Sequence, residues 1–145
     1  MEAVIFTGIQ ASGKSSFYLA RFFHTHVRIN MDMLRTRHRE RLLLRACLEM
    51  KQAFVVDNTN PSVESRRLYI EPAKSAGFYI TGYYFASGVA EAITRNNLRT
   101  GKQRIPPQAI GGTYKRLELP SYTEGYDALY RVMLGEPGQF LVEEW

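Results

Sequence analysis

The chain has 145 residues, of which 45% are hydrophobic and 23% charged, a composition typical of a globular domain rather than a disordered or fibrous one. Its formal net charge of +5 suits a polyanionic ligand without identifying one. No apolar run approaches the roughly 20 residues of a membrane-spanning helix, and a single cysteine, Cys47, excludes an internal disulfide. We therefore expect one domain over residues 1–145 and a cytoplasmic location without a signal peptide. Nothing in the sequence indicates membrane contact or an obligate protein partner.

The first predicted elements are a buried strand at residues 3–6, a glycine-rich turn and a helix at residues 15–23. The turn, Gly8-Ile9-Gln10-Ala11-Ser12-Gly13-Lys14-Ser15, matches the P-loop pattern at every fixed position. Its two glycines permit backbone conformations in which successive N–H groups converge on phosphate oxygens. In such loops the lysine reaches the β- and γ-phosphates and the serine hydroxyl ligates Mg²⁺. The sequence thus predicts an ATP and Mg²⁺ site, with nucleotide-binding positions at Gly8, Ala11, Ser12, Gly13, Lys14, Ser15 and Ser16.

Strands and helices alternate along the rest of the chain. Short apolar runs predict strands at residues 27–30, 53–57 and 78–85, and the segments between and after them predict helices at 33–51, 62–76, 89–99 and 108–117. Pro72 implies a kink or a break in the second of these helices. Two apolar runs, at 129–134 and 140–142, flank a turn at 135–138 and predict a hairpin. This order predicts an α/β fold: a parallel sheet of about four to five strands covered by helices on both faces, ending in an antiparallel hairpin.

Two acids directly follow predicted strands, at the sheet edge where ligands gather in open α/β folds. Asp57 closes the strand at 53–57, and we expect it to contact Mg²⁺ through water, although a cap for the following turn is the alternative. Asp32 follows the strand at 27–30, where it could take the proton from an attacking hydroxyl. From the residues alone, an N-cap for the helix at 33–51 is an equally good interpretation of Asp32.

Arginines are placed near both ends of this predicted site. Arg35 lies one helical turn after Asp32. Arg95 and Arg99 end a predicted helix just before a loop rich in Gly, Lys and Pro at residues 101–107. Arginines in that position can fold over the triphosphate and neutralise charge on the transferring phosphoryl group.

Several short sequence stretches, including the P-loop, occur along the chain in one order. They are the P-loop at 8–15, Arg28-Ile29-Asn30-Met31-Asp32 with Arg35, Val55-Val56-Asp57-Asn58-Thr59-Asn60-Pro61 with Arg66-Arg67, Arg95-Asn96-Asn97-Leu98-Arg99, Ile105-Pro106, Tyr114-Lys115, Pro120 and Glu124-Gly125-Tyr126. Together they resemble the 5′-kinase domain of polynucleotide kinases over nearly the whole chain. The resemblance implies an α/β P-loop kinase fold. It further implies that Asp32 is the general base for the polynucleotide 5′-hydroxyl and that Arg35 acts near the acceptor. It also implies that Arg99 is the lid arginine, with Arg95 as a neighbouring candidate.

Two features depart from that family. Met31 stands where the family often has arginine, so one positive charge beside the acceptor is missing, and the chain has no Asp-x-Asp-x-Thr signature of a phosphatase domain. We predict an ATP-dependent kinase that transfers the γ-phosphate to a 5′-hydroxyl end of DNA or RNA by in-line displacement. The predicted catalytic residues are Asp32, Lys14, Arg35 and Arg99, and the predicted metal contacts are Ser15 and Asp57. A kinase for a small molecule or nucleotide, and a non-catalytic ATP-binding regulatory module, are the alternatives.

Overall fold

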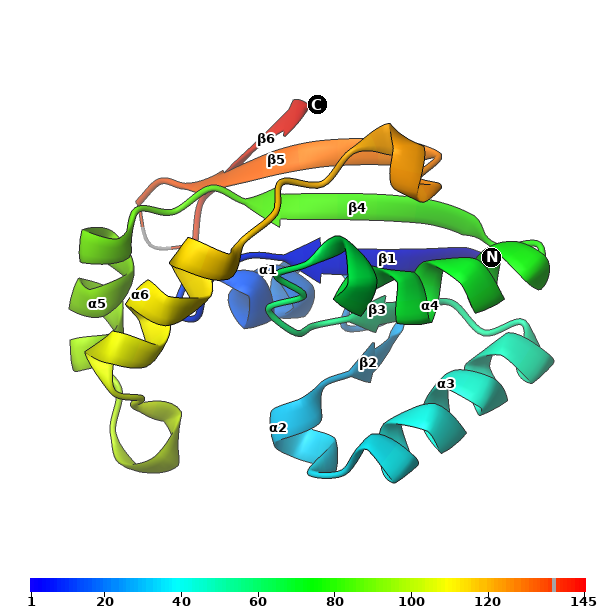
Figure 1. The fold of residues 1–145 in the computed structure, drawn as a ribbon, viewed down its shortest axis with the longest axis horizontal. Helices are drawn as coiled ribbons and strands as arrows, with labels where there is room; N and C mark the ends of the chain where they lie inside the picture. Colours follow the sequence, from blue (N-terminus) through cyan, green and yellow to red (C-terminus); the bar gives the residue numbers. More distant parts are fainter. Residues whose placement is uncertain (137) are drawn as a thin grey trace.

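A six-stranded sheet in the order β2-β3-β1-β4-β5-β6 forms the centre of the molecule (Figure 1). The computed structural model describes residues 1–136 and 138–145. The strands are β1 (Glu2–Thr7), β2 (Val27–Ile29), β3 (Phe54–Val56), β4 (Tyr79–Phe85), β5 (Ala128–Leu134) and β6 (Phe140–Glu144). The first five run parallel, and β6 pairs antiparallel with β5. The predicted parallel sheet with a C-terminal hairpin is thereby confirmed, while Pro137 of the predicted turn lies outside the described residues.

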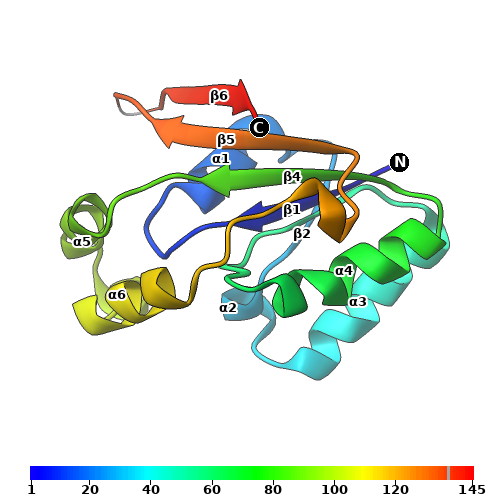
Figure 2. The same ribbon diagram turned by 45° about the horizontal axis from the view of Figure 1, so that its top comes forward.

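Helices cover both faces of this sheet. They are α1 (Lys14–Arg21), α2 (Met31–Leu34), α3 (Arg37–Met50), α4 (Val63–Ser75), α5 (Val89–Asn97) and α6 (Pro107–Arg116), with short 3₁₀ turns η1 (Gly101–Gln103) and η2 (Tyr122–Glu124). The helices α5 and α6 lie beyond the carboxyl ends of β1 and β4 (Figures 1 and 2). Among the described residues, no helix combines the length and hydrophobicity needed to cross a lipid bilayer.

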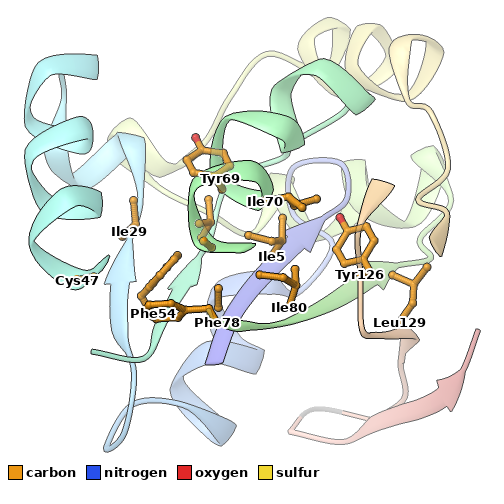
Figure 3. Close-up of a cluster of buried hydrophobic side chains, with 13 residues drawn as sticks. Ile5, Ile29, Cys47, Phe54, Tyr69, Ile70, Phe78, Ile80, Tyr126 and Leu129 are labelled. Atoms are coloured by element: carbon orange, nitrogen blue, oxygen red, sulfur yellow. The ribbon is translucent and has the colours of Figure 1, made fainter. Parts of the chain in front are cut away.

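The central strand β1 explains why the core divides into two layers. Successive side chains of a strand point to opposite faces, so Ala3 and Ile5 contribute to one cluster and Val4 and Phe6 to the other. The first cluster packs under α3 and α4 and includes Cys47, Tyr69 and Ile70 (Figure 3). The second packs under α1, through Phe17, Tyr18 and Phe22. Burial on both faces is the reason that β1 reads as a continuous apolar run.

One predicted helix is wrong. The segment at 33–51 is not continuous, because the chain breaks between α2 and α3 at Arg35, whose φ of 75° is left-handed. Two side chains stabilise the break: Asn30 accepts a hydrogen bond from the Met33 N–H and caps α2, and Thr36 accepts one from the Arg39 N–H and caps α3. Capping of this kind competes locally with continuation of the helix. The other predicted helices are observed within one or two residues, and α4 continues through Pro72 without a break.

Candidate active site

The P-loop connects the carboxyl end of β1 to the N-terminus of α1. A Cβ added at Gly8 would lie 2.9 Å from both the Phe85 Cβ and the Ser12 Oγ, so no other residue fits there without a shift. Gly13, with φ of 97°, is the N-cap of α1 and supplies no capping side chain. The described first turn of α1 also contains no acidic residue. Its backbone N–H groups and the positive end of the helix dipole are therefore left for an anion such as phosphate.

Lys14 is folded back over this loop. Its Nζ donates hydrogen bonds to the carbonyl oxygens of Gly8 at 3.0 Å and Ile9 at 2.6 Å. Burial lowers the pKa of Lys14 to about 8, an effect that the Asp57 and Asp32 carboxylates oppose and the Arg99 guanidinium reinforces. Three charged groups that are distant in the sequence thus act on one ammonium. Lys14 lies where phosphate oxygens, once present, would compete with the loop carbonyls for its protons.

Ser15 and Asp57 meet at the carboxyl edge of the sheet. The Ser15 hydroxyl donates a 2.9 Å hydrogen bond to Oδ2 of Asp57, which follows β3 and is 2% exposed. A hydroxyl and a carboxylate are hard oxygen donors that suit Mg²⁺. Among the described residues, no group of three or more His, Cys, Asp or Glu side chains could hold a metal ion. The pair therefore fits a Mg²⁺ ion whose other ligands are phosphate oxygens and water, as is usual for this ion.

Arg28 completes this cluster, and sequence analysis did not select it as a site residue. Its Nε donates to Asp57 Oδ2 at 2.9 Å and its Nη2 to Ser15 Oγ at 3.0 Å. Arg28 comes from β2, which pairs with β3 in a register that places Arg28 opposite Val55. The sequence offers two signals, a charged residue inside an otherwise apolar strand and the place of Arg28 in the stretch at 28–32. Neither identifies the contact, because it depends on the order of strands in the sheet.

The Asn-rich stretch after β3 ties together the elements around the site. Asn58 Oδ1 accepts a 3.0 Å hydrogen bond from the Met31 backbone, and Asn30 Nδ2 donates a 2.6 Å bond to the Asp57 carbonyl. These two bonds attach the start of α2 to the end of β3. They therefore determine where Asp32, the second residue of α2, stands relative to Asp57.

The same stretch also supports the P-loop. The Gly8 backbone N–H donates to the Thr59 carbonyl at 3.0 Å, and Asn60 Nδ2 donates to the Phe6 carbonyl at 2.8 Å. Asn60 adopts φ of 45°, a left-handed conformation that asparagine tolerates better than most residues. The Thr59 backbone and the Asn60 side chain thus connect the segment after β3 to the phosphate loop and to β1.

Asp32 is exposed in the first turn of α2. The capping role that the sequence left open belongs to Asn30 for α2 and to Thr36 for α3. No hydrogen bond occupies the Asp32 carboxylate among the described residues, so it is available to an incoming hydroxyl. Arg35, the other predicted residue on this side, is the exposed C-cap of α2.

Arg95 and Arg99, the two arginines predicted near the triphosphate, have different surroundings. The Arg95 guanidinium donates hydrogen bonds to the Ala11 carbonyl and the Ser87 hydroxyl, and so fastens α5 to the P-loop backbone. Arg99 lies beyond the end of α5, where its Nη1 donates to the Gln103 carbonyl at 3.3 Å. Arg99 is therefore less firmly attached than Arg95, and its positive charge acts on Lys14.

A second polar cluster lies behind the site, and nothing in the sequence analysis identified it. The buried carboxylate of Glu40 accepts hydrogen bonds from Tyr69 at 3.0 Å, Asn58 at 3.2 Å and Arg37 at 2.8 Å. Burial and the nearby Glu40 carboxylate raise the pKa of Tyr69 to about 12, so its hydroxyl remains a donor at neutral pH. The cluster connects α3 and α4 to the end of β3.

Comparison with known proteins places this geometry in context. No protein-family model matches the chain. The bifunctional polynucleotide phosphatase/kinase of Schizosaccharomyces pombe is 27% identical over 131 residues, which cover 86% of this chain and 32% of that protein. The chain therefore spans about a third of the length of the curated relative it matches.

Solved structures show the fold. A gluconokinase from Sinorhizobium meliloti 1021 superposes with a TM-score of 0.65 and 19% identity, over 94% of this chain and 85% of that one. The Kti12 protein of Chaetomium thermophilum, solved in complex with ADP-AlF₃, superposes with a TM-score of 0.67 and 16% identity, over 94% and 92% of the two chains. The chain has the α/β fold of the P-loop kinases.

Proposed function

We propose that this chain is an ATP-dependent kinase that phosphorylates the 5′-hydroxyl end of a polynucleotide. The observation that carries transfer, as opposed to nucleotide binding alone, is the position of Asp32. It stands at the same edge of the sheet as the P-loop, without a capping role, close enough for its carboxylate to influence the charge on Lys14. A non-catalytic ATP-binding module would need no free carboxylate beside its phosphate loop.

The P-loop would bind the donor. Backbone N–H groups of the loop and of the first turn of α1, from Ala11, Ser12, Gly13 and Ser16, would surround the β-phosphate, with Lys14 adding a mobile charge. The predicted position Gly8 would shape the loop instead, because its N–H donates to the Thr59 carbonyl. Mg²⁺ at Ser15 and Asp57 would neutralise phosphate charge when bound. Arg95 attaches α5 to the P-loop, and Arg99 would bring its guanidinium to the transferring group.

The acceptor would enter beside α2. Asp32 would take the proton of the attacking hydroxyl while that oxygen stands in line with the leaving group. Arg35, exposed at the end of the same short helix, would contact the acceptor strand. The polynucleotide class is supported by the relative in S. pombe and by the stretches Asp57-Asn58-Thr59-Asn60-Pro61 and Arg95-Asn96-Asn97-Leu98-Arg99. The net charge of +5 agrees with a polyanionic acceptor.

The test is transfer of label from γ-labelled ATP in Mg²⁺ to paired DNA and RNA oligonucleotides, one ending in a 5′-hydroxyl and one already 5′-phosphorylated. We expect label on the hydroxyl end alone. Asp32→Asn should abolish transfer and retain ATP binding, whereas Glu49→Gln, which removes an exposed acid on α3, should leave both unchanged. ATP binding without label on any oligonucleotide would overturn the polynucleotide acceptor.

A further inference from the structure

Arg28 holds the two oxygens that the proposed function assigns to Mg²⁺. Its Nε and Nη2 lie 2.9 Å from Asp57 Oδ2 and 3.0 Å from Ser15 Oγ, and these two oxygens lie 2.9 Å from each other. The three groups form a closed triangle, with one cation already bound to both oxygens. The guanidinium therefore contacts the same two oxygens that a metal ion would use.

Burial explains why a cation is needed there. Asp57 is 2% exposed, and an ionised carboxylate in such a place is strongly destabilised unless a positive charge lies beside it. Among the described residues, Arg28 is the cation in direct contact with this carboxylate. The ammonium of Lys14 is instead hydrogen-bonded to the Gly8 and Ile9 carbonyls. Arg28 is thus the direct counterion of Asp57 among the described residues.

Arg28 is less enclosed than the carboxylate it contacts. Its side chain is 27% exposed, in contrast to the 1% exposure of the Asp57 side chain, so solvent is within its reach. The Tyr18 ring, whose centroid is 5.9 Å from the Arg28 Cζ, offers an aromatic face to the guanidinium. A divalent ion and a guanidinium that share one carboxylate oxygen repel each other, so each weakens the contact of the other with Asp57 Oδ2.

We propose that Arg28 is an internal competitor of Mg²⁺ that sets how strongly nucleotide binding depends on the metal. Arg28 neutralises the Asp57 carboxylate, and Mg²⁺ at Ser15 and Asp57 competes with its two contacts there. The site is therefore stable without a metal, but it binds the metal less tightly than the same two oxygens would without the arginine. This inference rests on the Mg²⁺-nucleotide binding in the proposed function.

The first test measures ADP affinity by calorimetry, once in excess Mg²⁺ and once in EDTA, so that no transfer reaction interferes. The quantity of interest is the dissociation constant in EDTA divided by the dissociation constant in Mg²⁺. Arg28→Gln should raise this ratio by about tenfold, because Mg²⁺ no longer competes with a guanidinium and Asp57 has no other direct counterion. Mn²⁺ titration in the presence of ADP, followed by electron paramagnetic resonance, should show tighter metal binding in this variant.

Arg21→Gln is the matched control. Arg21 is an exposed arginine on α1 whose guanidinium also lies over an aromatic ring, 5.3 Å from the Phe17 centroid. It belongs to no carboxylate pair of the candidate site, so its loss should leave the ratio at the wild-type value. An unchanged or smaller ratio in Arg28→Gln would overturn the inference while leaving nucleotide binding, and with it the proposed function, intact.

A second measurement uses the wild-type protein and so does not depend on the folding of a variant. In wild-type protein with labelled arginine side chains, the Arg28 Nε–H resonance should persist when ADP binds in EDTA and shift when Mg²⁺ is added. A resonance unchanged at Mg²⁺-ADP saturation would overturn the inference alone. Absence of ADP and ATP binding under both conditions would overturn the proposed function, and the inference with it.

Discussion

The side-chain amide of Asn58 donates a 3.2 Å hydrogen bond to the buried carboxylate of Glu40, and so joins the end of β3 to the first turn of α3. The carbonyl oxygen of the same side chain accepts from the Met31 backbone. One asparagine therefore connects the helix that carries Asp32 to a carboxylate behind the site. The position of the proposed general base depends on groups that do not themselves contact a substrate.

Glu40→Gln should lower the free energy of unfolding by about 2 kcal/mol, because the amide cannot accept hydrogen bonds from all three donors and leaves a buried polar group unpaired. Urea unfolding measures this loss. Glu49→Gln on the exposed side of α3 is the control, with an expected change within about 0.5 kcal/mol. Equal stability of the two variants would show that the Glu40 cluster is energetically neutral.

Arg99→Ala should lower the rate of phosphoryl transfer on the order of 10²-fold with little change in ATP affinity, because a guanidinium at the transferring group acts mainly in the transition state. Single-turnover transfer and equilibrium ATP binding separate the two effects. Arg104→Ala removes a nearby exposed arginine whose Nη2 donates to Asn97 Oδ1 at 3.3 Å, and its rate should remain near that of the wild type. An unaltered rate in Arg99→Ala would remove this residue from the site.

The stability of the nucleotide-free protein should depend on Lys14 at alkaline pH. Its pKa is lowered from 10.5 to about 8, mainly by burial, so above pH 8 the folded chain loses a proton that the unfolded chain keeps. The unfolded state then binds more protons, and stability rises with pH. Relative to Lys14→Met, the wild type should gain about 1 kcal/mol between pH 8 and about pH 9 in urea unfolding. A pH-independent difference between the two proteins would contradict this assignment.

Nucleotide binding should raise the lowered pKa of Lys14 again. The negative charges of a bound triphosphate favour the ammonium form, so binding near pH 8.5, about half a unit above the free-state pKa of about 8, should be accompanied by proton uptake. Calorimetry in two buffers of different ionisation enthalpy measures that uptake. Lys14→Met should bind the nucleotide more weakly and without this proton. Identical heats in both buffers for the wild type would show that Lys14 is already protonated before binding.

Arg66→Met should destabilise the fold by about 3 kcal/mol, because it leaves the Glu124 carboxylate buried without its bidentate partner. Arg66 is fully buried, and its Nε and Nη2 lie 2.8 and 3.0 Å from the two carboxylate oxygens. The double variant Arg66→Met, Glu124→Gln should recover part of the loss. Arg67 is the next residue of α4 and forms an exposed 3.6 Å pair with Glu71. Arg67→Met should therefore cost at most about 1 kcal/mol. Similar losses for Arg66 and Arg67 would show that burial of the pair has no energetic consequence.

Features that depend on neighbouring residues could be predicted from the sequence. The P-loop is one of them, because Gly8, Gly13 and the residues between them determine the backbone of the turn locally. The strand at β1 is another, since a continuous apolar run can be accommodated only where both faces of a sheet are covered. Asp57 likewise could be placed beside Ser15, because parallel strands bring their carboxyl ends to one edge of the sheet.

Other features were decided only by the tertiary structure. The break between α2 and α3 was missed because residues 33–51 contain no Gly or Pro to mark it, while the caps Asn30 and Thr36 act through hydrogen bonds that the residue pattern does not report. The contacts of Arg28 with Asp57 and Ser15 require β2 to lie beside β3, and that order arises from packing between residues distant in the chain. The sequence by itself thus determined the phosphate loop and the succession of strands and helices. The strand order depends on long-range burial, and it placed Arg28 beside Ser15 and Asp57, the two residues proposed to bind Mg²⁺.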